Sequence, residues 1–346
     1  MNNLYSPINV LLCSSGRRNY LVEYFKEALA PFGGKVHTMN SEKYASSLYV
    51  ADNYSISPLI YSDEYESYLF EYCNKNEISI VIPLLDIELP ILSKLKLRFL
   101  ENGIRILVAD EWLTKIANDK WETNHFLEQN GFNVLPCFLN LEDLKNHIGK
   151  EQITFPLFIK PRWGMASIGV YKADDLDELF VYYKKSQKEV RNSYLKYESQ
   201  KDIENSVIIH SQLPSEEYGL DIINDLDGNY CNTLVKKKLK MFAGETEVAK
   251  LLDLPLLKDL GRKLSAITKH PGLMDVDVFF DGVKAFILDI NPRFGGGYPF
   301  IHEAGVDLPK AIIYWHLGLP VDLNLLQCKT DIVVLKGFKM INLNMN

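Results

Sequence analysis

Residues 274–299, MDVDVFFDGVKAFILDINPRFGGGYP, contain the pattern that decides the fold of the second half of this chain. Apolar and polar side chains alternate along residues 274–280, Asp281-Gly282 suits a two-residue turn, and residues 285–288 form a second apolar run. This pattern predicts a β-hairpin. Polar side chains on one face of otherwise apolar strands make that face a candidate site for chemistry.

Three polar side chains of the predicted hairpin are candidate metal ligands. Asp277 lies on the first strand, and Asp289 and Asn291 lie two residues apart on the second, so both face the same side. Carboxylate and amide oxygens suit Mg²⁺ that carries a polyphosphate, and Arg293 follows with a glycine run centred on Gly296, a candidate substrate contact. The alternative is a solvated acidic face, against which the apolar surroundings argue.

The bulk properties of the chain limit its class. At 346 residues it can form two or three domains, each with its own core. A net charge of −7 argues against general nucleic-acid binding, which needs a basic surface. No apolar run approaches the roughly 18 residues that span a bilayer, and the N-terminal segment lacks the pattern of a secretory signal. The five scattered cysteines have no metal-binding spacing, so we expect a reduced cytoplasmic protein without a zinc site.

The first 110 residues have the pattern of an α/β domain. Apolar runs that predict buried strands occur at residues 8–13, 35–39, 78–83 and 104–108. Helical patterns alternate with them at residues 21–29, 65–74 and 89–100. This alternation predicts a parallel sheet with right-handed crossovers.

The loops at the ends of these strands are candidate substrate contacts, because ligands of parallel sheets bind there. The loop SSGRR, at residues 14–18, lacks GxGxxG, which makes a dinucleotide site unlikely on this pattern. Arg17 stands at the start of a predicted helix and either holds a carboxylate or phosphate or is a surface arginine. Asp86 and Glu88 follow a later strand, where they either hold a substrate amine or make a contact between domains.

A strand and a glycine-bounded loop follow in the middle of the chain. Residues 155–161 predict a strand that carries Lys160 near its end, and Gly164 to Gly169, a loop that includes Ser167, comes next. The spacing resembles a Walker A loop, but Val170 occupies the position of its lysine, which excludes a P-loop NTPase. A loop whose amides close over a phosphate remains.

A second hairpin is predicted at residues 220–238, and its return strand carries a run of lysines. Strand geometry puts Lys236, Lys238 and Lys240 on one face. The run either faces solvent or neutralises a phosphate. In the second interpretation Lys238 is catalytic and Lys240 contacts the substrate. Other segments predict helices at residues 174–205, 251–268 and 304–317 and a short strand at 331–335.

The order of these motifs resembles the ATP-grasp fold. The residues that carry the resemblance are Lys120, Ile159-Lys160-Pro161 with its glycine loop, Gln212-Leu213, Glu217-Tyr218, Asp277 and Asp289-Ile290-Asn291-Pro292-Arg293. The N-terminal segments SSGRRNYL and IPLLDIELPIL are similar to the pre-ATP-grasp domain of the branch related to the carbamoyl-phosphate synthase large subunit. That branch includes stand-alone carboxylate–amine ligases.

The resemblance implies an α/β fold that becomes α+β in its second half. A Rossmann-like parallel-sheet pre-ATP-grasp domain is expected at residues 1–110, followed by a two-lobed ATP-grasp domain. Its first lobe, with a linker helix and the glycine loop, is expected at 111–205, and its second lobe, with the metal site, at 206–320. Residues 321–346 are expected to form a covering segment.

The resemblance also implies which residues hold the nucleotide. Lys120 and Lys160 match the two lysines that hold the α- and β-phosphates, and the loop from Gly164 to Gly169 matches the one that covers the γ-phosphate. Backbone groups near Ser211 and Leu213 match the hinge that reads adenine. Glu217 matches the acid that binds the ribose hydroxyls.

Roles in metal binding and catalysis follow from the same resemblance. Asp277, Asp289 and Asn291 match the ligands of Mg²⁺ or Mn²⁺, and Arg293 matches the arginine that steadies an acyl phosphate. The chain departs from the family pattern at two positions. Asp289 stands where Glu is more common, which shortens the reach of a ligand that bridges two metals. His210 stands in the hinge where Glu or Gln is more common, which leaves the adenine contact open.

The implied activity is an ATP-dependent ligation of a small-molecule carboxylate to an amine, through an acyl phosphate and with release of ADP and phosphate. One alternative is the bicarbonate- or carbamate-phosphorylating half of a carbamoyl-phosphate synthase, but this chain has one ATP-grasp unit and no glutaminase. Another is a non-catalytic ATP-binding module, against which the intact lysines, metal ligands and Arg293 argue. We expect small-molecule partners, neither nucleic acid nor membrane, and a homodimer is compatible with the family.

Overall fold

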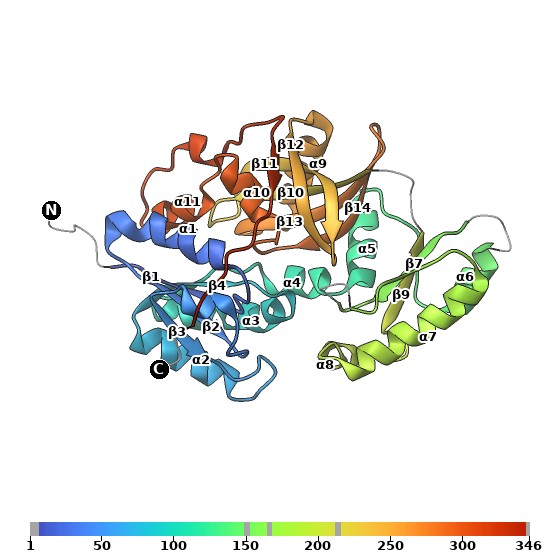
Figure 1. Cartoon of the computed structure of the whole chain (residues 1–346), viewed down its shortest axis with the longest axis horizontal. Helices are drawn as coiled ribbons and strands as arrows, with labels where there is room; N and C mark the ends of the chain where they lie inside the picture. Colours follow the sequence, from blue (N-terminus) through green and yellow to red (C-terminus); the bar gives the residue numbers. More distant parts are fainter. Residues whose placement is uncertain (1–6, 149–152, 165–167, 212–215, 344–346) are drawn as a thin grey trace.

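The protein is described by a computed structural model, which covers residues 7–148, 153–164, 168–211 and 216–343. Within these residues three β-sheets organise the fold, and helices pack on their faces (Figure 1). Two residues predicted for the site, Ser167 and Leu213, lie outside the described ranges.

The N-terminal domain is a five-stranded parallel sheet in the order β3-β2-β1-β4-β5. Its strands are β1 (Asn9–Cys13), β2 (Val36–Asn40), β3 (Asn53–Ile56), β4 (Ile78–Pro83) and β5 (Arg105–Ile106). Helices α1 (Asn19–Leu29), α2 (Tyr65–Lys75) and α3 (Leu89–Glu101) lie between them in the chain. The predicted α/β domain is confirmed. Strand β3 was not predicted, because it is an edge strand of alternating half-buried and exposed residues rather than an apolar run.

A smaller lobe follows, built on the antiparallel sheet β6-β9-β7-β8. Its strands are β6 (Cys137–Phe138), β7 (Leu157–Pro161), β8 (Tyr171–Ala173) and β9 (Val207–Ser211). The helices of this region are α4 (Glu111–Ala117), α5 (Lys120–Gln129), α6 (Leu141–Ile148), α7 (Leu176–Asn192) and α8 (Lys196–Ser199). Helix α7 buries Leu179 and Tyr183 in a core built from residues of this lobe, and the lobe stands apart from the rest in Figure 1.

The larger lobe is a six-stranded antiparallel sheet in the order β14-β13-β10-β11-β12-β15. Its strands are β10 (Glu216–Asn224), β11 (Tyr230–Phe242), β12 (Glu245–Leu252), β13 (Gly272–Phe280), β14 (Ala285–Asn291) and β15 (Val333–Leu335). Helices α9 (Pro255–Thr268), α10 (Tyr298–Glu303) and α11 (Leu308–His316) complete it. The predicted hairpin at residues 274–291 is confirmed as β13–β14.

The start of the helix predicted at residues 251–268 is wrong. Residues 245–252 pair with β11 and form β12, and the helix begins only at Pro255. Proline suits the first turn of a helix, where its missing N–H is not needed. The apolar residues Leu251 and Leu252 therefore belong to a strand rather than to the helix that follows.

The two faces of the large sheet have different roles. One face packs on α9, and its core includes Leu220, Val276 and Val278 from the strands and Leu257 and Leu264 from the helix. The residues that alternate with these strand positions point to the opposite face. Part of that opposite face is apolar and joins the core shared with the N-terminal domain, and the polar part carries the site described below.

A single apolar core joins the N-terminal domain to the larger lobe. Residues of β1 and α1, such as Val10 and Phe25, belong to the same buried cluster as Phe294, Tyr298 and Phe300. The phenol of Tyr24 on α1 also donates to Glu303 (3.1 Å). The N-terminal domain and the larger lobe therefore pack as one body.

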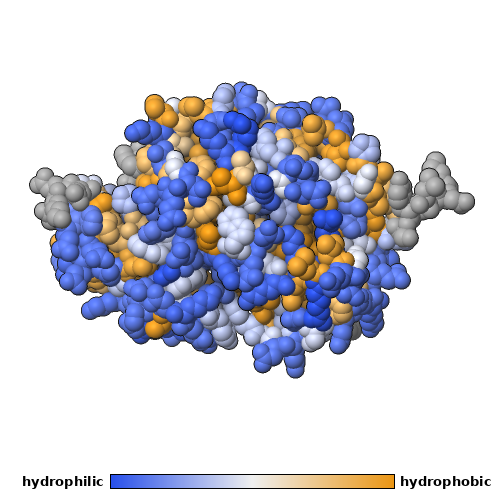
Figure 2. Space-filling view, turned by 180° about the vertical axis from the view of Figure 1, so that it is seen from behind, coloured by the Kyte–Doolittle hydropathy of each residue, from blue (hydrophilic) through white to orange (hydrophobic). Residues whose placement is uncertain are grey.

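Hydrophilic side chains dominate the face of the molecule shown in Figure 2, with smaller apolar areas between them. Across the described ranges no helix has both the length and the apolar character needed to cross a membrane.

Candidate active site

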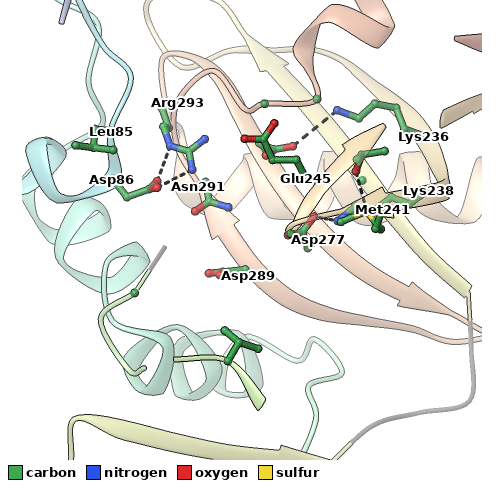
Figure 3. A pocket seen from close by; sticks show the side chains of 18 of the residues that line it. Leu85, Asp86, Lys236, Lys238, Met241, Glu245, Asp277, Asp289, Asn291 and Arg293 are labelled. Carbon is green, nitrogen blue, oxygen red and sulfur yellow. Dashed lines mark hydrogen bonds and ion pairs between the residues drawn. The ribbon is translucent and has the colours of Figure 1, made fainter. Parts of the chain in front are cut away.

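The β13–β14 hairpin brings its polar residues into direct opposition. Asp277 lies opposite Asp289, and Asp275 lies opposite Asn291 on the neighbouring strand. All four side chains line one cavity, and Figure 3 shows Asp277, Asp289 and Asn291 beside each other on the two strands. The predicted metal ligands are thus brought together, and Asp275 joins them.

Two lysines of β11 reach these carboxylates across the intervening strand β10. Lys238 Nζ lies 2.6 Å from Asp277 Oδ1 and also donates to Glu217. Gly219 lies opposite both Asp277 and Lys236, and a Cβ at Gly219 would be only 3.2 Å from the Cε atom of Lys236. The glycine therefore leaves the space through which the lysine side chains run.

The second lysine forms a buried pair that the sequence did not indicate. Lys236 Nζ lies 2.5 Å from Asp221 Oδ2 and 3.8 Å from Asp275 Oδ1, and the Lys236 and Asp221 side chains are almost fully buried. Burial raises the pKa of Asp221 to about 6, although Lys236 opposes the shift. Burial also raises the pKa of Asp275, a residue of β13 that lies opposite Asp221 of β10.

The carboxylate of Asp277 behaves differently from these two. Burial works to raise its pKa, but the ammonium group of Lys238 outweighs burial, and the pKa of Asp277 is lowered. The site therefore favours the ionised form of Asp277, the form in which a carboxylate binds a cation.

The smaller lobe contributes two further lysines. Lys120 is the first residue of α5, and its Nζ donates to the Gly164 carbonyl (2.8 Å) and lies 3.2 Å from Asp289 Oδ2. Lys160 lies near the end of β7 and lines the same cavity. Burial lowers the pKa of Lys160, and the carboxylate of Asp289 offsets that effect only in part. A bound polyanion would favour the charged form of this lysine.

The N-terminal domain closes the other end of the cavity through a two-point salt bridge. Arg293 Nε and Nη2 lie 2.6 and 2.7 Å from the two carboxylate oxygens of Asp86, as the dashed lines in Figure 3 show. Burial works to lower the pKa of Arg293, but Asp86 outweighs it and the pKa is raised. Asp86 thus makes a contact between domains and also lines the cavity.

The glycine run after Arg293 packs closely against the polar face. A Cβ at Gly295 would lie 2.2 Å from Asp275 Oδ2, and one at Gly297 would lie 2.7 Å from Lys236 Nζ. Side chains at these positions would collide with the buried ion pair, so the chain needs glycine there. Gly296 lines the cavity and has more room.

These elements enclose a cavity of about 390 Å³. Of the residues that the sequence predicted for the site, those that line it are Lys120, Lys160, Gly164, Lys238, Asp277, Asp289, Asn291, Arg293, Asp86 and Gly296. Glu217 reaches the site only through its bond to Lys238. Gly169, in a left-handed backbone conformation, accepts a hydrogen bond from Ser186 (2.7 Å) and does not line the cavity.

Three predicted substrate contacts lie away from the cavity. Arg17 is mostly exposed and pairs with Glu245 at 3.4 Å. Glu88 is fully buried and accepts a hydrogen bond from Tyr65 inside the N-terminal domain. Lys240 is exposed and pairs with Glu247 at 3.1 Å.

The structure corrects the prediction that Lys240 shares a face with Lys236 and Lys238. The register between β11 and β12 shifts between Lys238 and Lys240, so Leu239 is an extra residue in the strand. A β-bulge of this kind interrupts the alternation of side chains. The two lysines before the bulge face the cavity, and the one after it faces solvent.

The residue that stands in the predicted hinge, His210, packs against Phe158 with the two rings stacked at a centroid distance of 5.7 Å. Its Nδ1 donates to the Ser211 carbonyl (2.9 Å). Burial, together with the charge of Lys160, lowers the pKa of His210 to about 3, so the ring is neutral. Ser211 is the last residue of β9.

The cavity lining also includes charged residues that were not predicted for the site, among them Arg18, Glu245, Asp275 and Lys336. Lys236 lines it too, on the face that the strand alternation had assigned to it together with Lys238. Asp275 shares the strand alternation of Asp277, so the hairpin pattern could have included it. The choice between two consecutive arginines and the position of a lysine near the end of the chain depend on the tertiary fold, and no local signal gives them.

The donor set fits a hard cation such as Mg²⁺. Oxygen atoms come from Asp277, Asp289 and Asn291, and the Oδ1 atom of Asp289 is buried without a hydrogen-bond partner in the part of the chain that the structure describes. A buried carboxylate oxygen without a partner is costly unless a ligand satisfies it. No group of three His, Cys, Asp or Glu residues suited to a metal was found among the described residues, so the amide of Asn291 is needed to complete the set.

Comparisons with protein families agree with this geometry. Residues 10–107 match the family described as the PylC-like N-terminal domain. Residues 153–252 match the ATP-grasp domain, and residues 204–337 match the ATP-grasp of the biosynthetic pathway with Ter operon. The chain carries an ATP-grasp domain. The resemblance of the ATP-grasp motifs is thereby confirmed, and so is the fold that it implied, a parallel-sheet domain followed by antiparallel ATP-grasp sheets.

Solved structures share the ATP-grasp fold over nearly the whole chain. The biotin carboxylase domain of the Hydrogenobacter thermophilus 2-oxoglutarate carboxylase, in complex with MgADP, ADP and bicarbonate, is 15% identical, with a TM-score of 0.69 over 92% of this chain and 71% of its own. The N5-carboxyaminoimidazole synthetase from Staphylococcus aureus, in complex with ADP, is 14% identical, with a TM-score of 0.69 over 93% and 80%. The L-amino acid ligase from Bacillus licheniformis is 18% identical, with a TM-score of 0.67 over 95% and 79%. A comparison with curated proteins finds no match.

Proposed function

We propose that this protein is an ATP-dependent ligase that activates a small-molecule carboxylate by phosphorylation and joins it to an amine. The observation that carries the proposal is the facing pair Asp277–Asp289, with Lys120 at 3.2 Å from one carboxylate and Lys238 at 2.6 Å from the other. Cations and metal-binding oxygens at this spacing in one cavity suit a transferring phosphoryl group. The similar structures named above, which include an amino acid ligase and two carboxylating enzymes or domains, support the same class of chemistry.

The chemical need explains the residues. A carboxylate is a poor electrophile, because its negative charge and resonance disfavour attack by an amine. Transfer of the γ-phosphoryl group from ATP to a carboxylate oxygen breaks the bond to the leaving ADP and forms an acyl phosphate. The amine then attacks the carbonyl carbon and loses a proton, and inorganic phosphate leaves.

The chain's own residues would bind and position both substrates. Lys120 and Lys160 would hold the phosphates of ATP, and Lys238 with Arg293 would neutralise charge on the transferred group. Asp277, Asp289 and Asn291 would hold Mg²⁺, which would supply positive charge to offset the negative charge of the phosphates. Asp86 would fix the orientation of Arg293 through the two-point bond.

The amine also needs a place to lose its proton. Burial raises the pKa values of two acids beside the metal-ligand candidates, Asp221 and Asp275, and Asp275 lines the cavity. A carboxylate with a raised pKa is a better proton acceptor than an ordinary one. We assign Asp275 as the candidate proton acceptor within this proposal.

The experiment is a measurement of ADP release with Mg²⁺ and ATP over panels of carboxylic acids and amines, with and without bicarbonate. An amide product and one phosphate for each ADP are expected from one acid–amine pair. Turnover that only bicarbonate stimulates would favour the carbamoyl-phosphate-synthase-like alternative. ATP binding without turnover on any panel would favour a binding module.

Variants test whether this cavity is the active one. Lys160→Ala and Asp289→Ala should each abolish ADP release while the far-UV circular dichroism spectrum stays unchanged. Lys240→Ala is the matched control, because this lysine is exposed and lies beyond the bulge. Wild-type rates in Lys160→Ala and Asp289→Ala would refute the assignment.

A further inference from the structure

We propose that the cavity contains a second anion subsite, formed by Arg18 and Lys336, that binds a carboxylate of the substrate which is not phosphorylated. The inference rests on the proposed ligase function and names its substrate class: a molecule with a free carboxylate in addition to the reacting group. Arg18 comes from the loop before α1, and Lys336 from the residue after β15, so segments more than 300 residues apart build it.

Arg18 is a cation that lines the cavity without a counter-ion. It forms no ion pair with any residue in the described ranges, whereas the neighbouring Arg17 points to solvent and pairs with Glu245. Burial lowers the pKa of Arg18. Tyr20 works most strongly against this shift, followed by Asp86 and Glu245, whereas the charge of Arg293 adds to it. An arginine stays protonated in proteins, so a partly buried Arg18 that has no ionic partner among the described residues suits an anionic ligand.

Lys336 lines the same cavity, where backbone pairing holds it, and Glu245 acts on both Lys336 and Arg18. Its amide donates to the Glu247 carbonyl (2.9 Å) as the C-terminal segment continues past β15. Its Nζ lies 3.3 Å from Glu245 Oε2 and 5.6 Å from the ring centre of Phe300. The Cβ position of Gly296 would be 3.9 Å from the same Nζ, so this lysine stands beside the glycine run that follows Arg293.

The ion pairs around Arg293, Lys236 and Lys336 leave the charge of Arg18 without an acidic partner in the part of the chain that the structure describes. Asp86 is taken by Arg293 through both of its oxygens, and Lys236 is paired with Asp221. Glu245 forms ion pairs with both Arg17 and Lys336. Its side chain is 58% exposed, so water screens both pairs. Arg18 remains without any pair among the described residues. A substrate carboxylate beside Arg18 and Lys336 would complete the set.

A carboxylate suits this pair because a guanidinium group binds two carboxylate oxygens side by side, and an ammonium group can bind either oxygen from another direction. The carboxylate has two potential carriers. It belongs either to a dicarboxylic acid whose other group is activated or to an amino acid whose amine attacks. Both carriers present the same chemistry to Arg18, and the experiment separates them.

Binding is measured first, by calorimetry on the full chain with Mg²⁺ and a non-hydrolysable ATP analogue. The probes are the dicarboxylates from malonate to adipate and the common amino acids, each beside its monoamide or α-amide. We expect at least one free acid to bind about 10- to 100-fold more tightly than its amide, the range for one charge-assisted contact. Preference for a dicarboxylate identifies the activated acid as the carrier, and preference for an amino acid identifies the amine.

The variants then assign the preference to the two residues. Arg18→Ala and Lys336→Met should each reduce the free-acid preference about 10-fold, because each removes one charged contact. Binding of the amide and of the ATP analogue should not change. Arg18→Lys should restore part of the preference, whereas Arg17→Ala, which removes an exposed cation, should retain it within about threefold.

The outcomes separate this inference from the proposed function. If free acids and amides bind equally to the wild type, or if Arg18→Ala leaves the preference intact, the subsite is refuted even when the enzyme turns over. If the preference exists and depends on Arg18 but no panel member yields ADP, the subsite stands and the ligase proposal fails. If substrates are found by turnover, the KM for the free acid should rise in Arg18→Ala while kcat and the KM for ATP stay constant.

Discussion

Asp119 and Arg162 form a buried two-point salt bridge, in which Nε–Oδ1 and Nη2–Oδ2 are both 2.8 Å apart. Asp119 also accepts hydrogen bonds from Trp121 N and Glu122 N and so caps the helix that begins at Lys120. The backbone N–H of Lys120 donates to the Arg162 carbonyl (3.1 Å). Because Arg162 lies two residues after Lys160, one ion pair positions both lysines proposed to hold ATP.

Arg162→Met is therefore expected to affect stability and nucleotide binding together. The substitution leaves Asp119 buried without its partner, which costs about 3–5 kcal/mol of unfolding free energy. Displacement of the two lysines should raise the KM for ATP at least about 10-fold, the effect of one lost charged contact. Urea denaturation and the ADP assay measure the two effects. The control is Arg191→Met, since Arg191 is exposed and its ion pair with Glu204 is long, at 3.6 Å. A large loss of stability with an unchanged KM for ATP would show that the pair does not position the lysines.

The glycine run gives a prediction with a neighbour as its control. Gly295→Ala would place a methyl group 2.2 Å from Asp275 Oδ2, so the backbone must move, at a cost of about 1–3 kcal/mol. Gly296→Ala meets only Lys336 Nζ, at 3.9 Å, and should change the unfolding free energy little. Urea denaturation of the two variants measures the difference. Equal stability of the two variants would mean that the glycine run at residues 295–297 does not pack tightly against the buried ion pair.

Stability should depend on pH through Glu88. Burial raises the pKa of Glu88 to about 7, although Tyr65 opposes the shift, and Glu88 Oε2 has no hydrogen-bond partner within the described residues. The folded state then binds a proton that the unfolded state releases near its ordinary pKa, so stability falls as pH rises from about 4.5 to 7. The size of this effect is on the order of 3 kcal/mol. Glu88→Gln, which keeps the shape of the neutral acid, should flatten the dependence, measured as the urea midpoint at pH 5, 6, 7 and 8. Parallel curves for the two proteins would contradict the prediction.

Metal dependence should report on Asp289. Asp289→Asn removes the charge from a ligand whose Oδ1 has no protein partner among the described residues, so it should raise the Mg²⁺ concentration for half-maximal ADP release about 10-fold or more. Asp289→Glu should retain activity, because it keeps the charge and lengthens the reach. Asp281→Asn is the control, since Asp281 lies in the β13–β14 turn, where its side chain accepts from Val283 N. An unchanged Mg²⁺ requirement in Asp289→Asn would exclude this carboxylate as a ligand.

The polar face of the β13–β14 hairpin could be predicted because a strand repeats every two residues, and polar and apolar residues alternate at 274–278 and 289–291. The same rule placed Lys240 on the wrong face, because the bulge at Leu239 shifts the alternation. No local sequence pattern predicts that bulge. Strand β12 was missed for a related reason. It mixes charged residues (Glu245, Glu247 and Lys250) with apolar ones and is largely half exposed, and its pairing with β11 and β15 makes it a strand.

The positions of Arg18 and Lys336 in the cavity could not be predicted from local sequence patterns. Whether Arg17 or Arg18 faces the cavity depends on how the first loop turns into α1, and two consecutive arginines give no periodicity to decide it. Lys336 reaches Glu245 only because β15 adds to the edge of the large sheet. The individual roles of the residues that the resemblance suggested remain predictions, which the variants above test.

The apolar core that joins α1 to α10 and α11 has a consequence for any attempt to shorten this protein. Phe294, Tyr298 and Phe300 are buried in a cluster that includes Val10 and Phe25 from the other end of the chain. Removal of the first 110 residues would expose these aromatic rings to water and take away Asp86, the partner of Arg293. We therefore expect that the ATP-grasp lobes of this chain do not fold alone. A shortened protein should retain the parallel sheet.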